Sequence, residues 1–231
     1  MKWQLRTAKV ILGGDIMNTI DDMFPGNYQN YYLENKILGI NGSPRRNGNS
    51  DFIMKQLQDV TSDADILFNS VSLRDYQYSS CIGCEKCRKD KICTGLKDGL
   101  SFIYPLLLSS KGLVLISPTH NYNVSAWMKA FIDRLYCFYN FENNRPRSWT
   151  SQLVNENRKA VIIGICEQNH EDDMGYTIDA MARPLSALGY EIESKIPIYG
   201  VFDRGAVKNS EEIIEKIRKI GKNFSESIKS N

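Results

Sequence analysis

A run of closely spaced cysteines is the part of this chain with the clearest capacity for chemistry. Four of the six cysteines fall within thirteen residues, at Cys81, Cys84, Cys87 and Cys93. The spacing is C-x2-C-x2-C-x5-C, in which three thiolates can wrap one metal cluster and a fourth can close it. The C-x2-C-x2-C step is a known ligand spacing for iron-sulfur clusters. The run therefore favours a four-iron cluster held by these four thiolates.

Two other uses of these cysteines stay open on the spacing alone. Zinc also takes cysteine ligands, but structural zinc sites usually use two ligand pairs separated by a longer segment. A redox disulfide, or a set of thiols without a ligand, is the plainest alternative. We do not expect a structural disulfide framework, because the N-terminus has only the short apolar run Val10-Ile11-Leu12 in place of an export signal, and cytosolic thiols stay reduced.

The composition predicts one cytoplasmic α/β domain without a strong overall charge. The chain has 231 residues, of which 42% are hydrophobic, and this is enough for one well-packed core. Its 29 lysines and arginines against 27 acidic residues give no global field that would attract nucleic acid or an anionic membrane. No apolar run reaches the roughly 20 residues that span a bilayer. We therefore expect neither a nucleic-acid partner nor a membrane.

A polar loop separates the first predicted strand from the first predicted helix. The strand covers residues 36–40, the loop covers residues 41–50, and apolar residues then recur at helical spacing, namely Phe52, Ile53, Leu57 and Val60. Such a loop at a helix N-terminus can present backbone N–H groups and hydroxyls to a phosphate. Neither a P-loop nor the dinucleotide glycine pattern is present. A phosphate site and an ordinary capped turn both remain open.

Further apolar runs alternate with helical patterns along the chain. The other predicted strands are residues 66–73, 112–116, 160–165 and 191–199. The other predicted helices are residues 101–108, 125–138, 178–185 and 211–228. Five strands that alternate with helices predict a doubly wound parallel sheet. The cysteine run follows the second strand, and ligands collect at the carboxyl ends of the strands in such sheets.

Two stretches fall outside this alternation. Residues 1–35 have no clean period and contain the turn signal Pro25-Gly26, so we expect an extension outside a core domain of residues 36–231. Residues 140–157 are polar and are predicted to form an irregular excursion.

Three motifs in order resemble the NAD(P)H-dependent FMN reductase branch of the flavodoxin-like superfamily. They are residues 42–50, residues 118–125, and the segment Lys129-Ala130-Phe131-Ile132-Asp133-Arg134. The cysteine run, in its place after the second strand, resembles that of archaeal-type iron-sulfur flavoproteins. The resemblance covers residues 36 to about 225. It implies a flavodoxin-like fold, an FMN cofactor and a [4Fe-4S] cluster.

Carried over residue by residue, the resemblance implies an FMN site made of three loops. The phosphate would be held by Ser43, Arg45, Asn47, Asn49 and Ser50. The isoalloxazine would be lined by Pro118, Thr119, His120, Asn121, Tyr122 and Asn123. Its other side would be covered by residues 166–169, which begin with Cys166 and Glu167. Relatives commonly have Tyr two residues after the proline, where this chain has His120, so the contact at the flavin edge should differ.

Several single residues have a plainer interpretation beside the functional one. His120 and His170 are the only histidines, and both fall in loops next to the flavin, where an imidazole could relay protons. A loop histidine that hydrogen-bonds to backbone is the more ordinary role. Cys137 and Cys166 are expected to be buried core residues.

Charged residues surround the cysteine run. Four cations outnumber two anions within it, Lys86, Arg88, Lys89 and Lys91 against Glu85 and Asp90. One possibility is that these cations do no more than balance the negative charge of a cluster. The other is that their tips also form a docking site for an acidic protein. Farther along, Asp133 and Arg134 are expected to form a structural or subunit-interface ion pair.

Together these inferences predict an FMN and [4Fe-4S] electron-transfer flavoprotein. FMN exchanges one or two electrons and a cubane cluster exchanges one, so the two cofactors together can convert between two-electron and one-electron donors. The resemblance implies a homodimer or homotetramer that takes electrons from ferredoxin or a similar carrier and passes them to a small-molecule acceptor. A cluster-free NAD(P)H-dependent FMN or quinone reductase is the alternative enzyme. A zinc-bound or redox-sensing scaffold is the non-enzymatic alternative.

Overall fold

A parallel sheet of five strands forms the centre of the molecule. The computed structural model describes residues 11–12, 15–16 and 32–229. Its main strands are β3 (Glu34–Asn41), β4 (Leu67–Ser72), β5 (Ser110–His120), β9 (Lys159–Ile165) and β10 (Glu191–Ile198). They lie in the order β10-β9-β5-β3-β4. This is the flavodoxin-like order, so the predicted fold class is confirmed.

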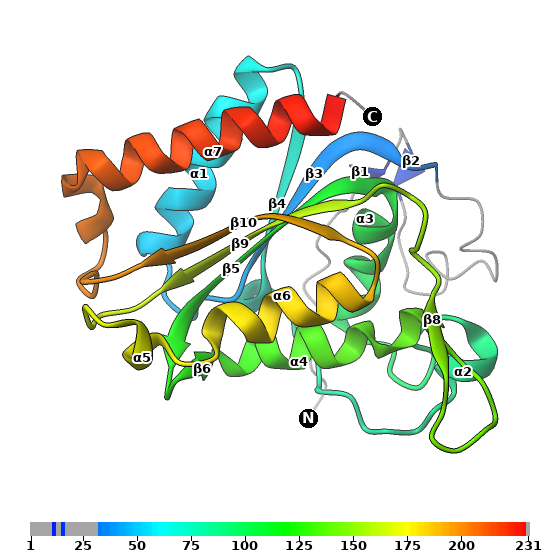
Figure 1. The fold of residues 1–231 in the computed structure, drawn as a ribbon. Helices are drawn as coiled ribbons and strands as arrows, with labels where there is room; N and C mark the ends of the chain where they lie inside the picture. Colours follow the sequence, from blue (N-terminus) through cyan, green and yellow to red (C-terminus); the bar gives the residue numbers. More distant parts are fainter. Residues whose placement is uncertain (1–10, 13–14, 17–31, 230–231) are drawn as a thin grey trace.

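Helices cover both faces of this sheet (Figure 1). On one face lie α1 (Asn49–Asp63) and α7 (Glu211–Lys229), which contact each other. On the other lie α3 (Tyr104–Ser109), α4 (Ala126–Arg134) and α6 (Thr177–Ala187). The remaining helical segments are short, namely η2 (Leu73–Asp75), α2 (Cys87–Asp90), η3 (Gly99–Phe102), η4 (Leu135–Phe138), α5 (Glu171–Met174) and η5 (Ala206–Asn209).

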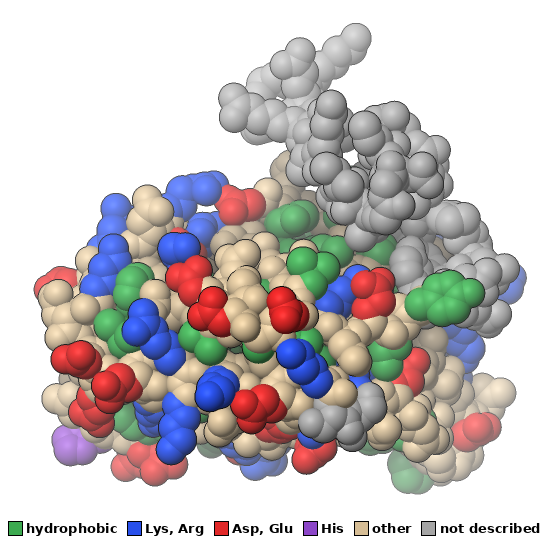
Figure 2. Space-filling view, turned by 90° about the horizontal axis from the view of Figure 1, so that it is seen from above, with side chains coloured by type: hydrophobic (Ala, Val, Ile, Leu, Met, Phe, Trp, Pro, Cys, Tyr) green, Lys and Arg blue, Asp and Glu red, His purple; other side chains and the backbone are tan. Residues whose placement is uncertain are grey.

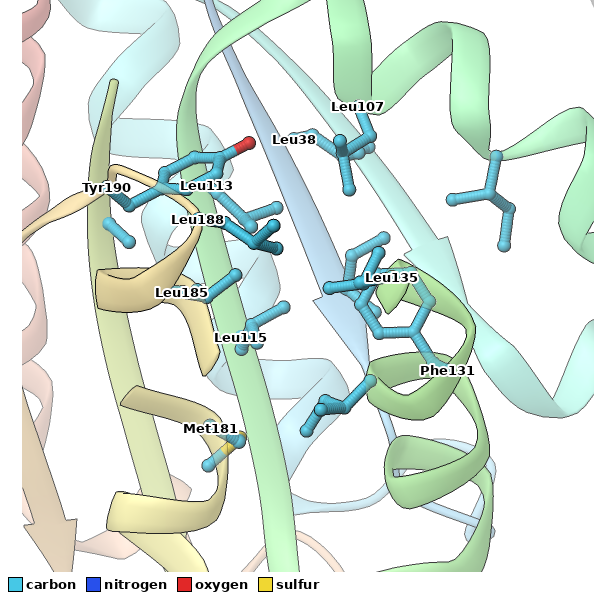
Figure 3. Close-up of a cluster of buried hydrophobic side chains, with 14 of the residues drawn as sticks. Leu38, Leu107, Leu113, Leu115, Phe131, Leu135, Met181, Leu185, Leu188 and Tyr190 are labelled. Carbon is cyan, nitrogen blue, oxygen red and sulfur yellow. The ribbon is translucent and has the colours of Figure 1, made fainter. Parts of the chain in front are cut away.

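The hydrophobic core has two halves because successive side chains on a strand point to opposite faces of the sheet. Ile37 and Val114 belong to the half covered by α1 and α7. Their neighbours Leu38 and Leu113 belong to the half covered by α3, α4 and α6. Figure 3 shows the second half, where side chains of β5 meet those of α4 and α6. Burial on both faces explains why these strands read as continuous apolar runs.

The stretch after the central strand differs from the prediction, which ended that strand at residue 116. The structure extends β5 to His120 and pairs it with β6 (Asn123–Val124) in an antiparallel hairpin. At its tip Asn121 has φ 48° and Tyr122 has φ 61°. Two central residues with positive φ are typical of the type I′ turns that match the twist of hairpin strands. The predicted flavin loop is therefore a defined hairpin.

Residues 140–157 also contain regular structure, so their prediction as irregular is wrong. The strands β7 (Tyr139–Phe141) and β8 (Trp149–Ser151) form a second hairpin. Aromatic rings hold it together, because Tyr139 contacts Trp149 edge-on with ring centroids 5.0 Å apart. Phe141 stacks on Tyr136 of η4 at 4.9 Å. Strands of three residues are too short for their alternation to be visible in the sequence.

Ser125 fixes the start of α4 to the ends of two strands. Its Oγ accepts a hydrogen bond from the N–H of Met128 and donates one of 2.6 Å to the carbonyl of Gly42, after β3. Its own N–H donates to Oγ of Ser117 in β5 at 3.1 Å. A Cβ on Gly42 would lie 2.8 Å from Cβ of Met128, so only glycine allows this approach. The helix therefore begins at the carboxyl edge of the sheet.

The surface carries mixed charge. Figure 2 shows blue and red side chains interspersed on the face seen from above, without a large patch of one sign. This agrees with the near balance of 29 basic and 27 acidic residues. Within the described residues, no helix is long and apolar enough to cross a membrane. Most of residues 1–35, which were predicted to form an extension, lie outside the described residues. The described part before residue 32 is the antiparallel pair β1 (Ile11–Leu12) and β2 (Asp15–Ile16).

Candidate flavin site and cysteine loop

The predicted phosphate loop lies between β3 and α1. Gly48 is the N-cap of α1, and no side chain caps the helix there. The first N–H groups of a helix have no partner within the helix. Ser43 and Ser50 are buried beside this end, with exposures of 5% and 3%. An uncapped helix N-terminus with two hydroxyls close by suits a phosphate.

A buried polar network that the sequence analysis missed supports this loop. Arg74 of η2, the second residue after β4, binds both carboxylate oxygens of Asp51 at 2.8 and 2.9 Å. Its other terminal nitrogen donates to the carbonyls of Ser43 and Arg45. Asn41 donates to Asp51 and accepts from the N–H of Ser43. The sequence offered one sign that Arg74 supports this loop, namely a basic residue close after the end of a predicted strand.

Two of the predicted phosphate residues have side chains bound to the loop after β10. The guanidinium of Arg45 lies 4.4 Å from the ring centroid of Phe202 and donates to the carbonyl of that residue. The amide of Asn49 donates to the carbonyl of Asp203 at 3.0 Å and accepts from the N–H of Val207 at 3.2 Å. One hydrogen of this amide and the backbone N–H of Asn49 stay available to a phosphate. Asn47 is exposed with φ 54°.

The hairpin of β5 and β6 carries the residues predicted to line the flavin ring. Thr119 shares a hydrogen bond of 3.0 Å with Thr177 of α6, which holds its side chain inward. Oδ1 of Asn123 accepts the N–H of Val124. Pro118 is half-buried, whereas His120, Asn121 and Tyr122 at the tip are exposed. The tip can therefore contact a ligand or a neighbouring chain.

The third loop begins at the end of β9. Cys166 is 4% exposed, and its backbone bonds to Ile198 and Val201 beside the end of β10. Glu167, the next residue, is exposed. Cys137 is 2% exposed. The expectation that both cysteines are buried is confirmed.

Gly175 joins the second and third loops. The N–H of Tyr176 donates to the carbonyl of Tyr122 at 2.8 Å. Gly175 has φ 54° and ψ −128°, and a Cβ there would lie 2.6 Å from Cβ of Tyr122. Only glycine tolerates both this conformation and this contact. The hairpin tip and the segment before α6 are thereby held together.

The cysteine loop lies elsewhere, so its expected place at that edge is wrong. After η2 the chain turns back along α4, where the hydroxyl of Tyr78 donates to the carbonyl of Trp127. The helix α2, which begins at Cys87, contacts η4 and β7 beyond the far end of α4. Figure 1 shows α2 and β8 at one end of the molecule and β6 and α5 at the other. At 1.5 Å per residue, Ser125 and Arg134 are about 14 Å apart along the helix.

The four cysteines line one cavity of about 410 Å3, together with Gly95, Arg134 and Tyr136. Cys81 and Cys84 are exposed, and Cys87 and Cys93 are half-buried. Burial, followed by the neighbouring Cys93, Cys81 and Cys84, raises the pKa of Cys87 to about 11.

Four thiol donors line this cavity. Among the described residues, no three His, Cys, Asp or Glu side chains are grouped as around one metal ion. In a cubane each thiolate binds a different iron, so such a grouping is not required. The four soft thiol donors and the space between them therefore fit an iron-sulfur cluster.

Polar contacts tie the cysteine loop to the hairpin of β7 and β8. Arg147 donates to Glu85 at 3.1 Å. Hydrogen bonding to Arg147, with help from Arg88, lowers the pKa of Glu85. Lys91 donates to Asn140 at 2.7 Å, so this loop is held on its outer side as well.

The expected ion pair between Asp133 and Arg134 is not formed. Asp133 pairs with Lys129 at 2.6 Å on the exposed side of α4. Arg134 instead pairs with Asp98 at 2.8 Å. Adjacent helical residues point in different directions, about 100° apart, so neighbours in sequence seldom face each other.

Comparison with known proteins identifies the family. The model described as NADPH-dependent FMN reductase matches residues 35–163, more than half of the chain. The chain belongs to the NADPH-dependent FMN reductase family. It is therefore an FMN-dependent oxidoreductase with a flavodoxin-like fold.

Relatives within this FMN reductase family are iron-sulfur flavoproteins. One from Methanocaldococcus jannaschii is 26% identical over 198 residues, which cover 84% of this chain and 97% of that protein. One from Archaeoglobus fulgidus is 34% identical over 98 residues, 42% of this chain and 49% of that protein. One from Clostridioides difficile is 33% identical over 104 residues, 43% of this chain and 45% of that protein. The second and third matches thus span about half the length of those relatives.

Solved structures support the fold of this FMN reductase family member. An FMN-dependent NADH-azoreductase from Bacillus anthracis, in complex with FMN, matches with a TM-score of 0.62 and 15% identity over 82% of this chain and 99% of that chain. A flavone reductase matches with a TM-score of 0.60 and 14% identity over 84% of this chain and 63% of that chain.

Replacing Gly175 with alanine should disrupt the contact between the second and third loops. Gly205→Ala is the control, because Gly205 also has positive φ, 78°, but an added Cβ meets only Lys208, at 3.6 Å or more. We expect Gly205→Ala to lower the free energy of unfolding by about 1 kcal/mol. Gly175→Ala should lower it by a further 1–3 kcal/mol, roughly the cost of overpacking. Urea denaturation measures both, and equal values would contradict the described contact.

Proposed function

We propose that this FMN-dependent oxidoreductase also carries a [4Fe-4S] cluster and passes electrons between a one-electron carrier and a small-molecule acceptor. The observation that carries the proposal is the single cavity lined by Cys81, Cys84, Cys87 and Cys93. The relatives named iron-sulfur flavoproteins support it. When bound, the cluster would exchange one electron at a time and FMN one or two.

The three loops at the carboxyl edge of the sheet are the proposed FMN site. The phosphate group would be held by Ser43, Arg45, Asn47, Asn49 and Ser50. The ring would be lined by Pro118, Thr119, His120, Asn121, Tyr122 and Asn123, with Cys166 and Glu167 on its other side. The uncapped start of α1 supports the first assignment. The hydrogen bonds that fix Thr119 and the backbone of Tyr122 support the second, because they hold the ring-lining residues in place.

The four loop cysteines would bind the cluster as thiolates. At neutral pH the raised pKa of Cys87 keeps this group protonated in the metal-free chain. Cluster assembly should therefore release protons. Gly95 supports the assignment, because a side chain at Gly95 would collide with Sγ of Cys84.

The separation of the two sites along α4 supports a homodimer or homotetramer. Within one chain the cysteine loop and the flavin loops lie at opposite ends of this helix. A second copy could bring its cysteine loop to the exposed hairpin tip at His120, Asn121 and Tyr122. Sedimentation of the protein with both cofactors bound tests this arrangement. A monomer whose intramolecular electron exchange is independent of protein concentration would contradict it.

Changing one loop cysteine should remove the cluster and spare the flavin. Cys84→Ala is the best variant, because this thiol is exposed and its loss leaves no cavity in the core. We expect a large loss of iron and of broad visible absorbance, with one FMN per chain retained. Cys137→Ala is the control and should keep its iron.

Cys93→Ala tests the fourth ligand of the cluster. An intact four-iron cluster in this variant would place that ligand elsewhere. Wild-type protein with FMN but no iron would favour the cluster-free NAD(P)H-dependent reductase.

A negative charge at the start of α1 should weaken FMN binding. In Ser50→Asp the carboxylate stabilises the helix N-terminus but repels a phosphate that binds there. We expect the dissociation constant for FMN to rise at least about tenfold, which is roughly 1.4 kcal/mol. Ser62→Asp, the same change in the last turn of the same helix, is the control. Quenching of flavin fluorescence measures both, and unchanged affinity in Ser50→Asp would remove the phosphate from this loop.

A ferredoxin-like carrier is the proposed electron donor, and its docking site would be the exposed lysines Lys86, Lys89 and Lys91. Arg88 is less suitable, because it is half-buried and bonds to Glu85 and Asn143, whereas Lys91 stays exposed beside its bond to Asn140. Lys89→Glu should slow reduction by ferredoxin, and added salt should slow it in the wild type. Reduction by dithionite should stay unchanged.

Lys216→Glu is the control for this docking site, because it makes the same charge change on α7. It should leave the ferredoxin rate at the wild-type value. A ferredoxin rate that does not change with salt or with Lys89→Glu would remove these lysines as the docking site.

A further inference from the structure

Arg134, the last residue of α4, is a buried cation at the base of the cysteine loop. Its side chain is 1% exposed. One terminal nitrogen donates to the carbonyl of Ser79 at 3.0 Å and to Oδ2 of Asp98 at 2.8 Å. The other donates to the carbonyl of Leu96 at 3.4 Å and to Oδ1 of Asp98 at 3.2 Å. Since Ser79 precedes the first cysteine and Leu96 follows the last, Arg134 binds both ends of the loop.

Asp98 closes the same connection from the other side. Its Oδ2 accepts the N–H of Ser79 at 3.1 Å. It is also the N-cap of η3, where its Oδ1 accepts the N–H of Leu100 and its own N–H donates to Ser101. The carboxylate is therefore held by a rigid turn. Arg134 and Asp98 together fix the entry and exit of the cysteine loop, residues 79–98, independently of any cluster ligand.

One donor of Arg134 is left over. Its Nε is buried and has no hydrogen-bond partner among the described residues. Arg134 also lines the cavity formed by the four cysteines. Arg134 therefore has one donor that neither the loop backbone nor Asp98 uses.

The charge of Arg134 is secure. Burial opposes it, but the hydrogen bonds to Asp98 outweigh burial and raise the pKa of Arg134. The guanidinium thus brings a permanent positive charge to the cavity wall. Asp98, whose side chain is 17% exposed, pairs with this guanidinium at 2.8 Å and brings a negative charge beside it.

We propose that Arg134 is a positioning residue that closes the cysteine loop and whose charge favours the more negative state of the cluster. This inference rests on the proposed [4Fe-4S] cluster. Charges and hydrogen bonds near the sulfurs set the potential of such clusters. A positive charge on the cavity wall raises the midpoint potential, and the carboxylate of Asp98 lowers it.

The midpoint potential of the cluster distinguishes two roles of the Arg134–Asp98 ion pair, one that only holds the loop and one in which the charges act on the cluster. Arg134→Gln and Asp98→Asn break the same ion pair, and both keep a polar side chain of similar size. If the pair only held the loop, both variants would move the midpoint potential in the same direction. If charge acts on the cluster, Arg134→Gln moves it to more negative values and Asp98→Asn to more positive values.

The experiment is a dithionite titration of the cluster under anaerobic conditions, followed by EPR, on the full chain with both cofactors bound. Arg134→Lys keeps the charge and loses the two-pronged contact. It should leave the potential close to the wild-type value and speed hydrogen exchange in residues 79–98. Lys55→Gln removes a positive charge from the exposed side of α1, on the other face of the sheet, and should not move the potential.

Each outcome decides the proposal. Opposite shifts in Arg134→Gln and Asp98→Asn support it, and shifts of the same sign, or none, overturn it. If Arg134→Gln holds no iron, the other two variants decide. A more positive midpoint potential in Asp98→Asn, with an unchanged potential in Arg134→Lys, supports the proposal. A more negative potential in Asp98→Asn overturns it. Wild-type protein without iron overturns both the proposed cluster and this role. Iron in the wild type with shifts of one sign overturns only the role of Arg134.

Discussion

The parallel register of β3, β5 and β9 determines where the flavin loops begin. Asn41 of β3 pairs with Ile116 of β5, and Pro118 of β5 pairs with Ile165 of β9. All three strands are buried on both faces, so a slip of one residue would turn apolar side chains to the wrong side. Their carboxyl ends therefore reach one edge together. The network around Arg74 and the hydroxyl of Ser125 then only adjusts loops whose starting points the sheet has already set.

The helix α4 connects this edge to the cysteine loop. Ser125 binds the strand ends at its start, and Arg134 binds both ends of the cysteine loop at its finish. The edge of the sheet and the cysteine loop are each held by their own polar contacts. The position of each is therefore set without a ligand bound at the other. The same helix keeps the two sites of one chain about 14 Å or more apart, from its length alone. This separation is the physical reason for the proposal that a second copy brings its cysteine loop to the hairpin tip.

The sequence predicted the strands, the main helices and the sheet class because burial on both faces leaves a strong local signal, as in residues 112–116. It did not predict the place of the cysteine loop. The chain between β4 and Cys81 has no periodic pattern, and its path is set by contacts with residues far along the sequence, such as Tyr78 with Trp127. The partner of Arg134 was missed for the same reason, since Asp98 is 36 residues away. The hairpin tip at Tyr122 was not predicted, because a bulky residue seldom adopts positive φ and is therefore not a typical turn residue.

The central claim is that one chain holds both FMN and a four-iron cluster in its cysteine-lined cavity. Anaerobic analysis of iron, labile sulfide, zinc and flavin on the same purified sample, with a visible spectrum before and after dithionite, tests it most directly. We expect one FMN and about four irons and four sulfides per chain, with broad absorbance that dithionite bleaches. FMN without iron and sulfide, or zinc in place of iron, would contradict it.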